Sequence, residues 1–251
     1  MKLAIAIVIT ALISSFLSPN LGLTEASLAT YLGFLVALVV VMVSFEVPAL
    51  LEHRRVTGEV GRLRVLPWAL VVAALFVLVS RLSSLQPGYL WGVVLGVVFM
   101  RTDTSADEGR EQAAGALWTL IVAILAWLGL TWVRTSGTDP TFFNVAAQTA
   151  LAAIVVSALE AVAFGMMPFR FMPGVAIYRW NRLVWAVLFG ASLFAFFHLL
   201  IGPTSGYLSN LTGPAWLAAL GVFAAFGIFT LLFWAWFRFR PSPAAEGSPE
   251  G

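Results

Sequence analysis

The sequence predicts an all-α fold, a polytopic bundle of about eight transmembrane helices with no soluble domain. Of its 251 residues, 61% are hydrophobic and 10% are charged, whereas a soluble domain contains about 45–50% apolar and about 25% charged residues. With 20 Phe and 10 Trp, the chain also lacks the composition of a disordered protein. Finally, its apolar residues gather in eight separate runs, which are the predicted spanning helices.

A helix of about 20 residues crosses a hydrocarbon core of about 30 Å. The runs lie near residues 3–17, 28–50, 66–80, 88–100, 113–133, 145–168, 181–201 and 214–237. The first and fourth are short. The first, which follows Lys2, also has the pattern of a secretory signal peptide, but no Ala-x-Ala cleavage site follows it. Cleavage would leave seven spans. The fourth could be a re-entrant loop instead of a span.

The basic residues between the runs favour eight crossings. If every run crosses, 12 basic residues lie on one face of the membrane and only Arg81 and Arg134 on the other. If the run 88–100 turns back, the split becomes 6 against 8. The positive-inside rule favours the first arrangement, which predicts a plasma-membrane protein with both termini cytoplasmic. Residues 1–240 then form one bundle, and the Pro/Gly/Ser-rich segment 241–251 is predicted to be a disordered tail.

Three ionisable residues within the runs are candidate functional groups, because a charge at the bilayer centre costs at least about 2.5–3.5 kcal/mol. Glu160 lies deepest; it is protonated, paired with Arg170, or a polar tether between helices. Glu46 and His198 lie near the ends of their runs, where solvation at the interface is the alternative. The other histidine, His53, lies in the opposite loop, so we predict no metal site and no cofactor.

Two polar loops follow runs of the first half of the chain. The loop 52–64 is basic, and we interpret it as a topogenic anchor that can contact anionic headgroups. The loop 101–111 contains four acids but lacks the spacing of a calcium-binding loop, so it is predicted to be solvated. The chain has no Cys and no nucleotide-binding or hydrolase motif, which predicts that it is not an enzyme and has no nucleic-acid partner.

A Pro-rich segment after the sixth run carries a family resemblance. The motif consists of Phe164, Gly165, Met166, Met167 and Pro168, and it is followed by Pro173, Gly174 and the segment 178–182. It resembles the signature of bacterial FGLLP motif-containing membrane proteins, and residues 86–96 look like a second landmark of that family. The resemblance covers about residues 28–240 and implies no known activity.

The same segment also has a physical interpretation. Pro168, Pro173 and Gly174 predict that the sixth helix stops in a tight loop. Because its Phe and Met side chains are apolar, we expect the loop to pack against the bundle or dip into the interface. The neighbouring arginines are then candidates to bind lipid phosphates or a partner's carboxylates: Arg170, Arg179 and Arg182.

A more remote resemblance is to site-2-type intramembrane metalloproteases. The segment 45–49 resembles their His-Glu-x-x-His motif, and 164–174 their second motif, with Glu46 at the general-base position. The two histidine positions hold Phe45 and Ala49, and the aspartate position holds Pro173. With every zinc ligand missing, zinc proteolysis is excluded, and the resemblance implies at most a degenerate scaffold.

We therefore expect a membrane scaffold or partner subunit of the bacterial envelope, without intrinsic catalysis. Its expected partners are membrane lipids and another membrane or envelope protein. One alternative is a transporter or lipid-handling protein that uses Glu160. A second alternative is the degenerate, metal-free protease scaffold.

Overall fold

The computed structural model describes residues 2–16, 22–58, 62–65, 74, 77–78, 95–98, 105–136, 141–169 and 172–201. These residues include four helices that are long and apolar enough to cross a membrane. They are α2 (Glu25–Thr57), α4 (Ser105–Thr135), α5 (Phe142–Gly165) and α7 (Arg182–Phe196), which continues as the π-helix η1 (Phe197–Ile201). The shorter elements are α1 (Lys2–Ser15), β1 (Arg62–Val65), β2 (Leu95–Val98) and α6 (Pro173–Trp180).

Capping side chains set the start of two of the long helices, α2 and α7. The Thr24 hydroxyl accepts a hydrogen bond from the Ser27 amide (3.2 Å) at the start of α2. At the start of α7, Asn181 Oδ1 accepts from the amides of Leu183 (2.9 Å) and Val184 (3.1 Å). These bonds satisfy amides that have no partner within the first helical turn.

The end of α2 and a point within it are also set by the sequence. Gly58 ends the helix in the left-handed conformation (φ 72°), and its amide donates to the Arg54 carbonyl (3.0 Å). Pro48 lies inside the helix. Since proline has no amide hydrogen, the Ser44 carbonyl receives no bond from the residue four positions later.

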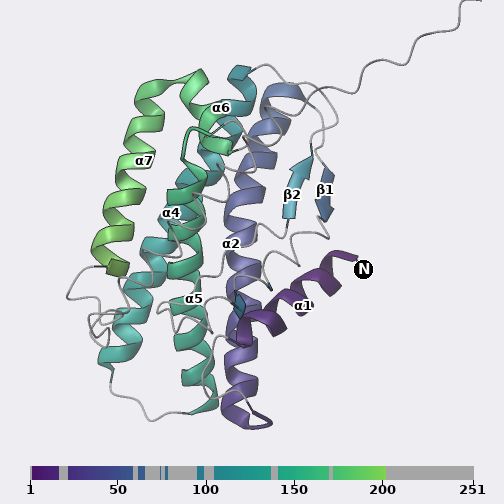
Figure 1. The fold of residues 1–251 in the computed structure, drawn as a ribbon, viewed down its shortest axis with the longest axis vertical. Helices are drawn as coiled ribbons and strands as arrows, with labels where there is room; N and C mark the ends of the chain where they lie inside the picture. The colour runs from purple at the N-terminus through teal and green to yellow at the C-terminus, as the bar shows by residue number, and fades with distance from the viewer. Residues whose placement is uncertain are drawn as a thin grey trace, which may run out of the picture. The chain divides into compact units, whose positions relative to one another are not determined.

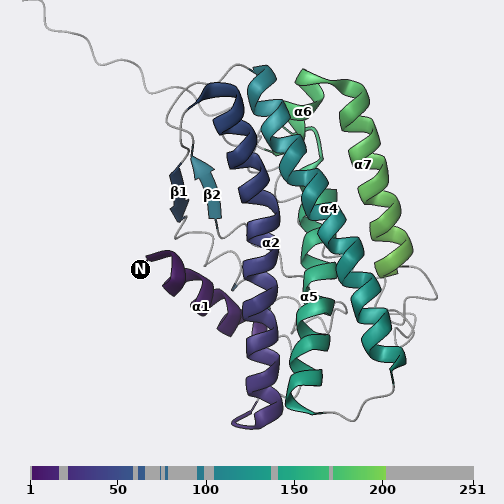
Figure 2. The same ribbon diagram turned by 180° about the vertical axis from the view of Figure 1, so that it is seen from behind.

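The long helices alternate in direction, as Figures 1 and 2 show: α2 and α5 run one way, and α4 and α7 run the other. Glycine allows α2 to approach α5 closely, since a Cβ on Gly33 would lie 2.7 Å from Thr149 Cβ and 2.9 Å from the Ala146 carbonyl oxygen. On α4, a Cβ on Gly115 would lie 2.7 Å from the Phe45 carbonyl oxygen. Side chains at either glycine would push the helices apart.

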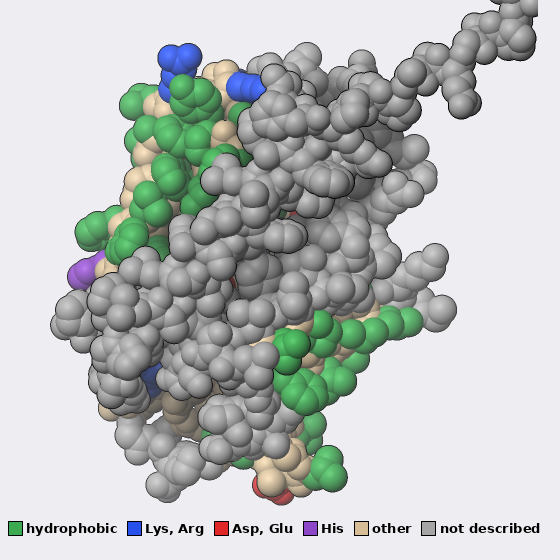
Figure 3. Space-filling model, in the orientation of Figure 1, with side chains coloured by type: hydrophobic (Ala, Val, Ile, Leu, Met, Phe, Trp, Pro, Cys, Tyr) green, Lys and Arg blue, Asp and Glu red, His purple; other side chains and the backbone are tan. Residues whose placement is uncertain are grey.

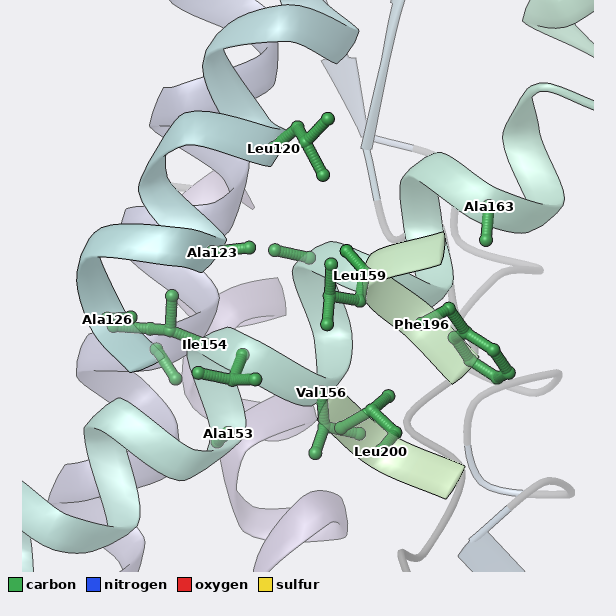
Figure 4. Packing of buried hydrophobic residues seen from close by; sticks show 14 residues of the cluster. Leu120, Ala123, Ala126, Ala153, Ile154, Val156, Leu159, Ala163, Phe196 and Leu200 are labelled. Atoms are coloured by element: carbon green, nitrogen blue, oxygen red, sulfur yellow. The ribbon is translucent and has the colours of Figure 1, made fainter. Parts of the chain in front are cut away.

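Two apolar clusters form the core between these helices. The first joins small and branched side chains of α4 and α5 to the end of α7, with Leu120 and Ala123 close to Leu159, and Phe196 and Leu200 beyond (Figure 4). The second lies nearer α6 and contains Ala113, Ala116, Val162, Met166, Ile177 and Leu188. Many large apolar side chains on the outer faces are exposed, as Figure 3 shows along α7, which fits helices that face lipid.

Four of the predicted spans are confirmed as helices of the described chain: 28–50, 113–133, 145–168 and 181–201 correspond to α2, α4, α5 and α7. The count of about eight is not supported. The run 3–17 does form α1, but its 14 residues reach only about 21 Å, and α1 lies obliquely across α2 (Figures 1 and 2). Most of the run 66–80 and all of 214–237, like the tail 241–251, lie outside the described residues.

The prediction of a spanning helix at 88–100 is wrong for residues 95–98. They form β2, which pairs antiparallel with β1 in a register that places Leu63 opposite Val97. Glycine and β-branched valine weaken a helix, and valine favours a strand. These residues dominate the segment 92–98.

Both predicted polar loops are also partly wrong, because α2 and α4 extend into them. Residues 52–57 continue α2, and α4 begins at Ser105. Asp107 and Glu108 lie in the first turn of α4, where negative charge interacts favourably with the helix dipole. Three of the four acids of this segment, Asp107, Glu108 and Glu111, therefore lie on a helix and not in a loop, and Asp103 lies outside the described residues.

Candidate functional site

Polar side chains lie between α2 and α4 at the level where the two apolar clusters meet. Ser44 Oγ lies 3.2 Å from Thr119 Oγ1 and 2.7 Å from the Val41 carbonyl oxygen. The Ser44 hydroxyl has one proton, so it can donate a hydrogen bond to only one of these oxygens at a time. The Thr119 hydroxyl donates to the Gly115 carbonyl (2.9 Å). Ser44 and Thr119 are both buried. This contact joins the two helices with neutral hydroxyl groups.

Two of the predicted candidates, Glu46 and Glu160, are buried near this level. Glu46 is 9% exposed and Glu160 is 1% exposed. The helices α2 and α5 run parallel and meet where Gly33 packs on Thr149. Glu46 and Glu160 lie thirteen and eleven residues further along, which is about 20 Å and about 17 Å. The two acids therefore lie at similar depth in the bundle. We call Ser44, Glu46, Thr119 and Glu160 the polar layer.

A buried pair that the sequence analysis missed lies nearer the end of the bundle where α6 is found. His53 of α2 and Glu111 of α4 are 2% and 0% exposed, and His53 Nδ1 lies 2.8 Å from Glu111 Oε1. Phe45 of α2 contacts Gly115 of α4. His53 lies eight residues after Phe45, and Glu111 lies four residues before Gly115, so both lie closer to the α6 end, by about 12 Å and about 6 Å. Each helix thus brings one ionisable group to the same buried contact.

An open groove of about 940 Å³ lies beside this pair, lined by α2, α4, α6 and α7. Its charged lining residues are Glu52, Arg55 and Arg110, and the rest of the lining is apolar, with Trp180 from α6. The Arg110 guanidinium lies 5.9 Å from the centre of the Trp180 ring, within the range of a cation–π interaction. Arg55 Nη1 lies 3.8 Å from Glu52 Oε2, and the Arg55 side chain is 82% exposed.

Two of the three predicted arginines, Arg179 and Arg182, do not line this groove. Arg179 and Arg182 are exposed, and the Arg182 guanidinium lies 5.3 Å from the centre of the Tyr178 ring. Arg170 lies outside the described residues. The arginines that line the groove are Arg55 and Arg110. Both belong to segments that were predicted to be loops.

The motif 164–168 ends α5, as predicted. The helix ends at Gly165, and Met166 is buried, with its carbonyl accepting a hydrogen bond from Trp185 Nε1 (2.8 Å). The Phe164 ring packs edge-on against Phe196, 5.8 Å between ring centres.

Beyond the buried Met166, the loop is partly outside the core. Met167 is half-buried, and Pro168 and Phe169 are exposed. Pro173 then begins α6, and Gly174 packs directly on the Met166 backbone. The expected packing of the loop against the bundle is therefore seen at Met166 and Gly174 but not at Phe169.

The remaining candidate, His198, lies apart from the polar layer. It is in the π-helix η1, is exposed, and stacks on Phe194 with ring centres 5.5 Å apart. Of the positions compared with protease ligands, Phe45 packs against the cluster that contains Met166. In the described part of the chain, no three His, Asp or Glu residues come together in a way that could bind a metal ion.

A helical pattern in the sequence could have indicated the missed pair. Glu46, Ala49 and His53 are spaced by three and four residues, and all three are buried on α2. Glu111 and Gly115 have the same spacing on α4. Residues three or four apart share a helix face. Continuing the helices past the apolar runs would have placed both ionisable groups on inner faces.

The chain was compared with protein-family models, with curated proteins and with solved structures, and none of them matches it. The resemblances noted in the sequence therefore stay predictions, and the features of the molecule that bear on its function are the polar layer, the buried pair and the groove.

Proposed function

We propose that this protein is a transporter that moves protons across the membrane through the ionisable residues buried between α2, α4 and α5. The observation that carries the proposal is the burial of four such residues in three adjacent helices: Glu46, His53, Glu111 and Glu160 are all at most 9% exposed. Transport of this kind involves no chemical catalysis, so it agrees with the prediction that the protein is not an enzyme.

Burying ionisable groups costs more free energy than joining two helices through neutral side chains. A charge at the centre of a bilayer costs at least about 2.5–3.5 kcal/mol, and the net stability of a whole protein is only about 5–15 kcal/mol. The hydroxyl contact between Ser44 and Thr119 joins α2 and α4 without that cost. Tethering α2 to α5 through acids at similar depth would therefore cost more free energy than a hydroxyl contact. Acids in these positions are, however, able to accept and release protons.

The direction of the bundle in the membrane follows from its arginines. In helices α2 and α4–α7, five arginines lie toward the α6 end, namely Arg54, Arg55, Arg110, Arg179 and Arg182, whereas Arg134 lies toward the other end. By the positive-inside rule, this distribution supports a cytoplasmic α6 end in a plasma-membrane protein. The crossing predicted at 214–237, which follows η1, belongs to the same proposal.

The test uses the full chain reconstituted into liposomes that contain a pH-sensitive dye. A potassium gradient with valinomycin drives protons inward, and the initial rate of acidification is measured. We expect Glu160→Gln and Glu46→Gln to lower the rate to that of protein-free liposomes. Glu108→Gln, a matched change of an exposed acid on α4, should leave it unchanged.

The reading of Glu160 as a tether predicts a different result. A tether would give Glu160→Gln a shifted unfolding temperature with an unchanged acidification rate. That outcome, or a wild-type rate equal to that of empty liposomes, would refute proton transport.

The scaffold or partner-subunit function is the second candidate, and the outer face of α7 favours it. Leu183, Val187 and Phe194 are exposed on this helix, and a Cβ on Gly190 would meet no atom within 4 Å. A small residue between larger apolar ones is typical of the face on which a second transmembrane helix packs. A stoichiometric complex in the native membrane that is lost in Gly190→Trp would support this candidate.

A further inference from the structure

We propose that the groove between α2, α4 and α7 binds one anionic phospholipid. The groove is charged where α2 ends and α4 begins, and apolar further along α4 and α7. A phospholipid has the same order of chemistry, with a charged headgroup followed by apolar chains. The inference is independent of proton transport, because it concerns other residues and is measured by binding.

The charged part of the groove suits a phosphate. Arg55 and Arg110 carry two positive charges there, and Glu52, 3.8 Å from Arg55, carries one negative charge. The net charge is therefore positive, which favours an anion. An arginine guanidinium can donate two parallel hydrogen bonds to phosphate oxygens. Arg110 also lies against the Trp180 ring, and indole rings prefer the headgroup level of a membrane.

The apolar part of the groove suits acyl chains. Leu117 lies seven residues after Arg110 on α4, about 10 Å further along the helix. Leu117, Leu183 and Val187 line the groove and are 46%, 73% and 62% exposed. Apolar surface of this extent would be unfavourable beside water but is matched by lipid chains. A volume of about 940 Å³ lies at the upper end of the range of about 300–1,000 Å³ for ligand pockets.

The experiment measures lipid binding to the full chain in detergent by native mass spectrometry. The probes are phosphatidylglycerol and phosphatidylcholine with identical acyl chains, together with glycerol 3-phosphate, which has the anionic group without the chains. Arg110→Gln and Arg55→Gln remove the charges, and Val187→Trp fills the apolar part. The matched controls are Arg182→Gln, an exposed arginine at the same end, and Ala191→Trp, an exposed α7 position outside the groove.

We expect phosphatidylglycerol to bind more tightly than phosphatidylcholine. Arg110→Gln should weaken phosphatidylglycerol binding about fivefold to tenfold, the loss of one charge-assisted contact. Val187→Trp should weaken binding of both lipids. The two control variants should bind both lipids like the wild type.

Three outcomes would overturn the proposal. Equal binding of the two lipids would show that the groove does not select an anion. Glycerol 3-phosphate competing as well as the lipid, with no effect of Val187→Trp, would show that the site binds a free anion. An effect of Arg182→Gln equal to that of Arg110→Gln would show that lipid binds through general surface charge.

Discussion

The buried contact between His53 and Glu111 gives the sharpest test of the helix packing. The perturbation is a double-mutant cycle with His53→Leu, Glu111→Leu and the double variant, which replaces both ionisable groups by apolar side chains. Each single change withdraws one partner from a group that is at most 2% exposed. Each single variant leaves one buried polar group opposite an apolar side chain. The double variant removes both polar groups and so avoids that cost.

The structure sets the magnitude. The two atoms are 2.8 Å apart, and a hydrogen bond to a charged group contributes about 1.5–3 kcal/mol. Double-mutant cycles within membrane proteins give less, about 0.6 kcal/mol on average and up to about 1.7 kcal/mol. We therefore expect a coupling energy of about 1–2 kcal/mol, with the double variant more stable than the sum of the single effects predicts.

The assay is unfolding in detergent, followed by the fluorescence of the ten tryptophans. The matched control is the same cycle on Glu52 and Arg55, which are 3.8 Å apart, with Arg55 82% exposed. An exposed pair of this kind contributes about 0.2–1 kcal/mol at most. A His53–Glu111 coupling no larger than that of the control pair would refute the packing of α2 against α4 described above.

Two further predictions concern backbone geometry. Gly33→Ala should destabilise the protein by about 1–3 kcal/mol, because the added Cβ would lie 2.7 Å from Thr149 Cβ. The control is Gly190→Ala, which should not destabilise the protein because no atom lies within 4 Å of its Cβ. Equal unfolding temperatures for the two variants would contradict the close approach of α2 and α5. Asn181→Ala should lower the free energy of unfolding by about 1 kcal/mol, because it removes the cap of α7. Asn181→Ser should retain most of that stability, since serine can also cap a helix. If serine lowers the free energy of unfolding as much as alanine does, Asn181 does not act as a cap.

The sequence predicted the long helices well because each carries a continuous apolar run of sufficient length. It predicted their ends less well, since capping and tertiary contacts decide where a helix stops. The segment with Glu111 is polar, and its composition alone is that of a solvated loop. In the structure α4 starts at Ser105, and the partner that makes Glu111 a buried residue, His53, lies 58 positions away. The three- and four-residue spacings could have placed each of these residues on an inner helix face, but no local pattern could have shown that the two contact each other.

The candidate site was predicted in part for the same reason. Glu46 and Glu160 were found because an acid within an apolar run is conspicuous, and both are buried. His198 is also an ionisable residue within an apolar run, but it is exposed and stacks on Phe194. Whether such a residue is buried depends on which neighbouring helix covers it. The groove combines residues from four elements, so its existence depends on packing and not on any one segment.

Pro48 has a consequence for how α2 opens. The Ser44 carbonyl lacks its amide partner, so the ladder of α2 is one bond short beside Glu46. Breaking the neighbouring bonds costs less there than in an intact turn, and hydrogen exchange reports such local opening directly. Among the buried turns of α2, the amides around residues 44–49 should exchange fastest with deuterium. Water would then reach the helix first at the level of the polar layer, where Glu46 would meet it.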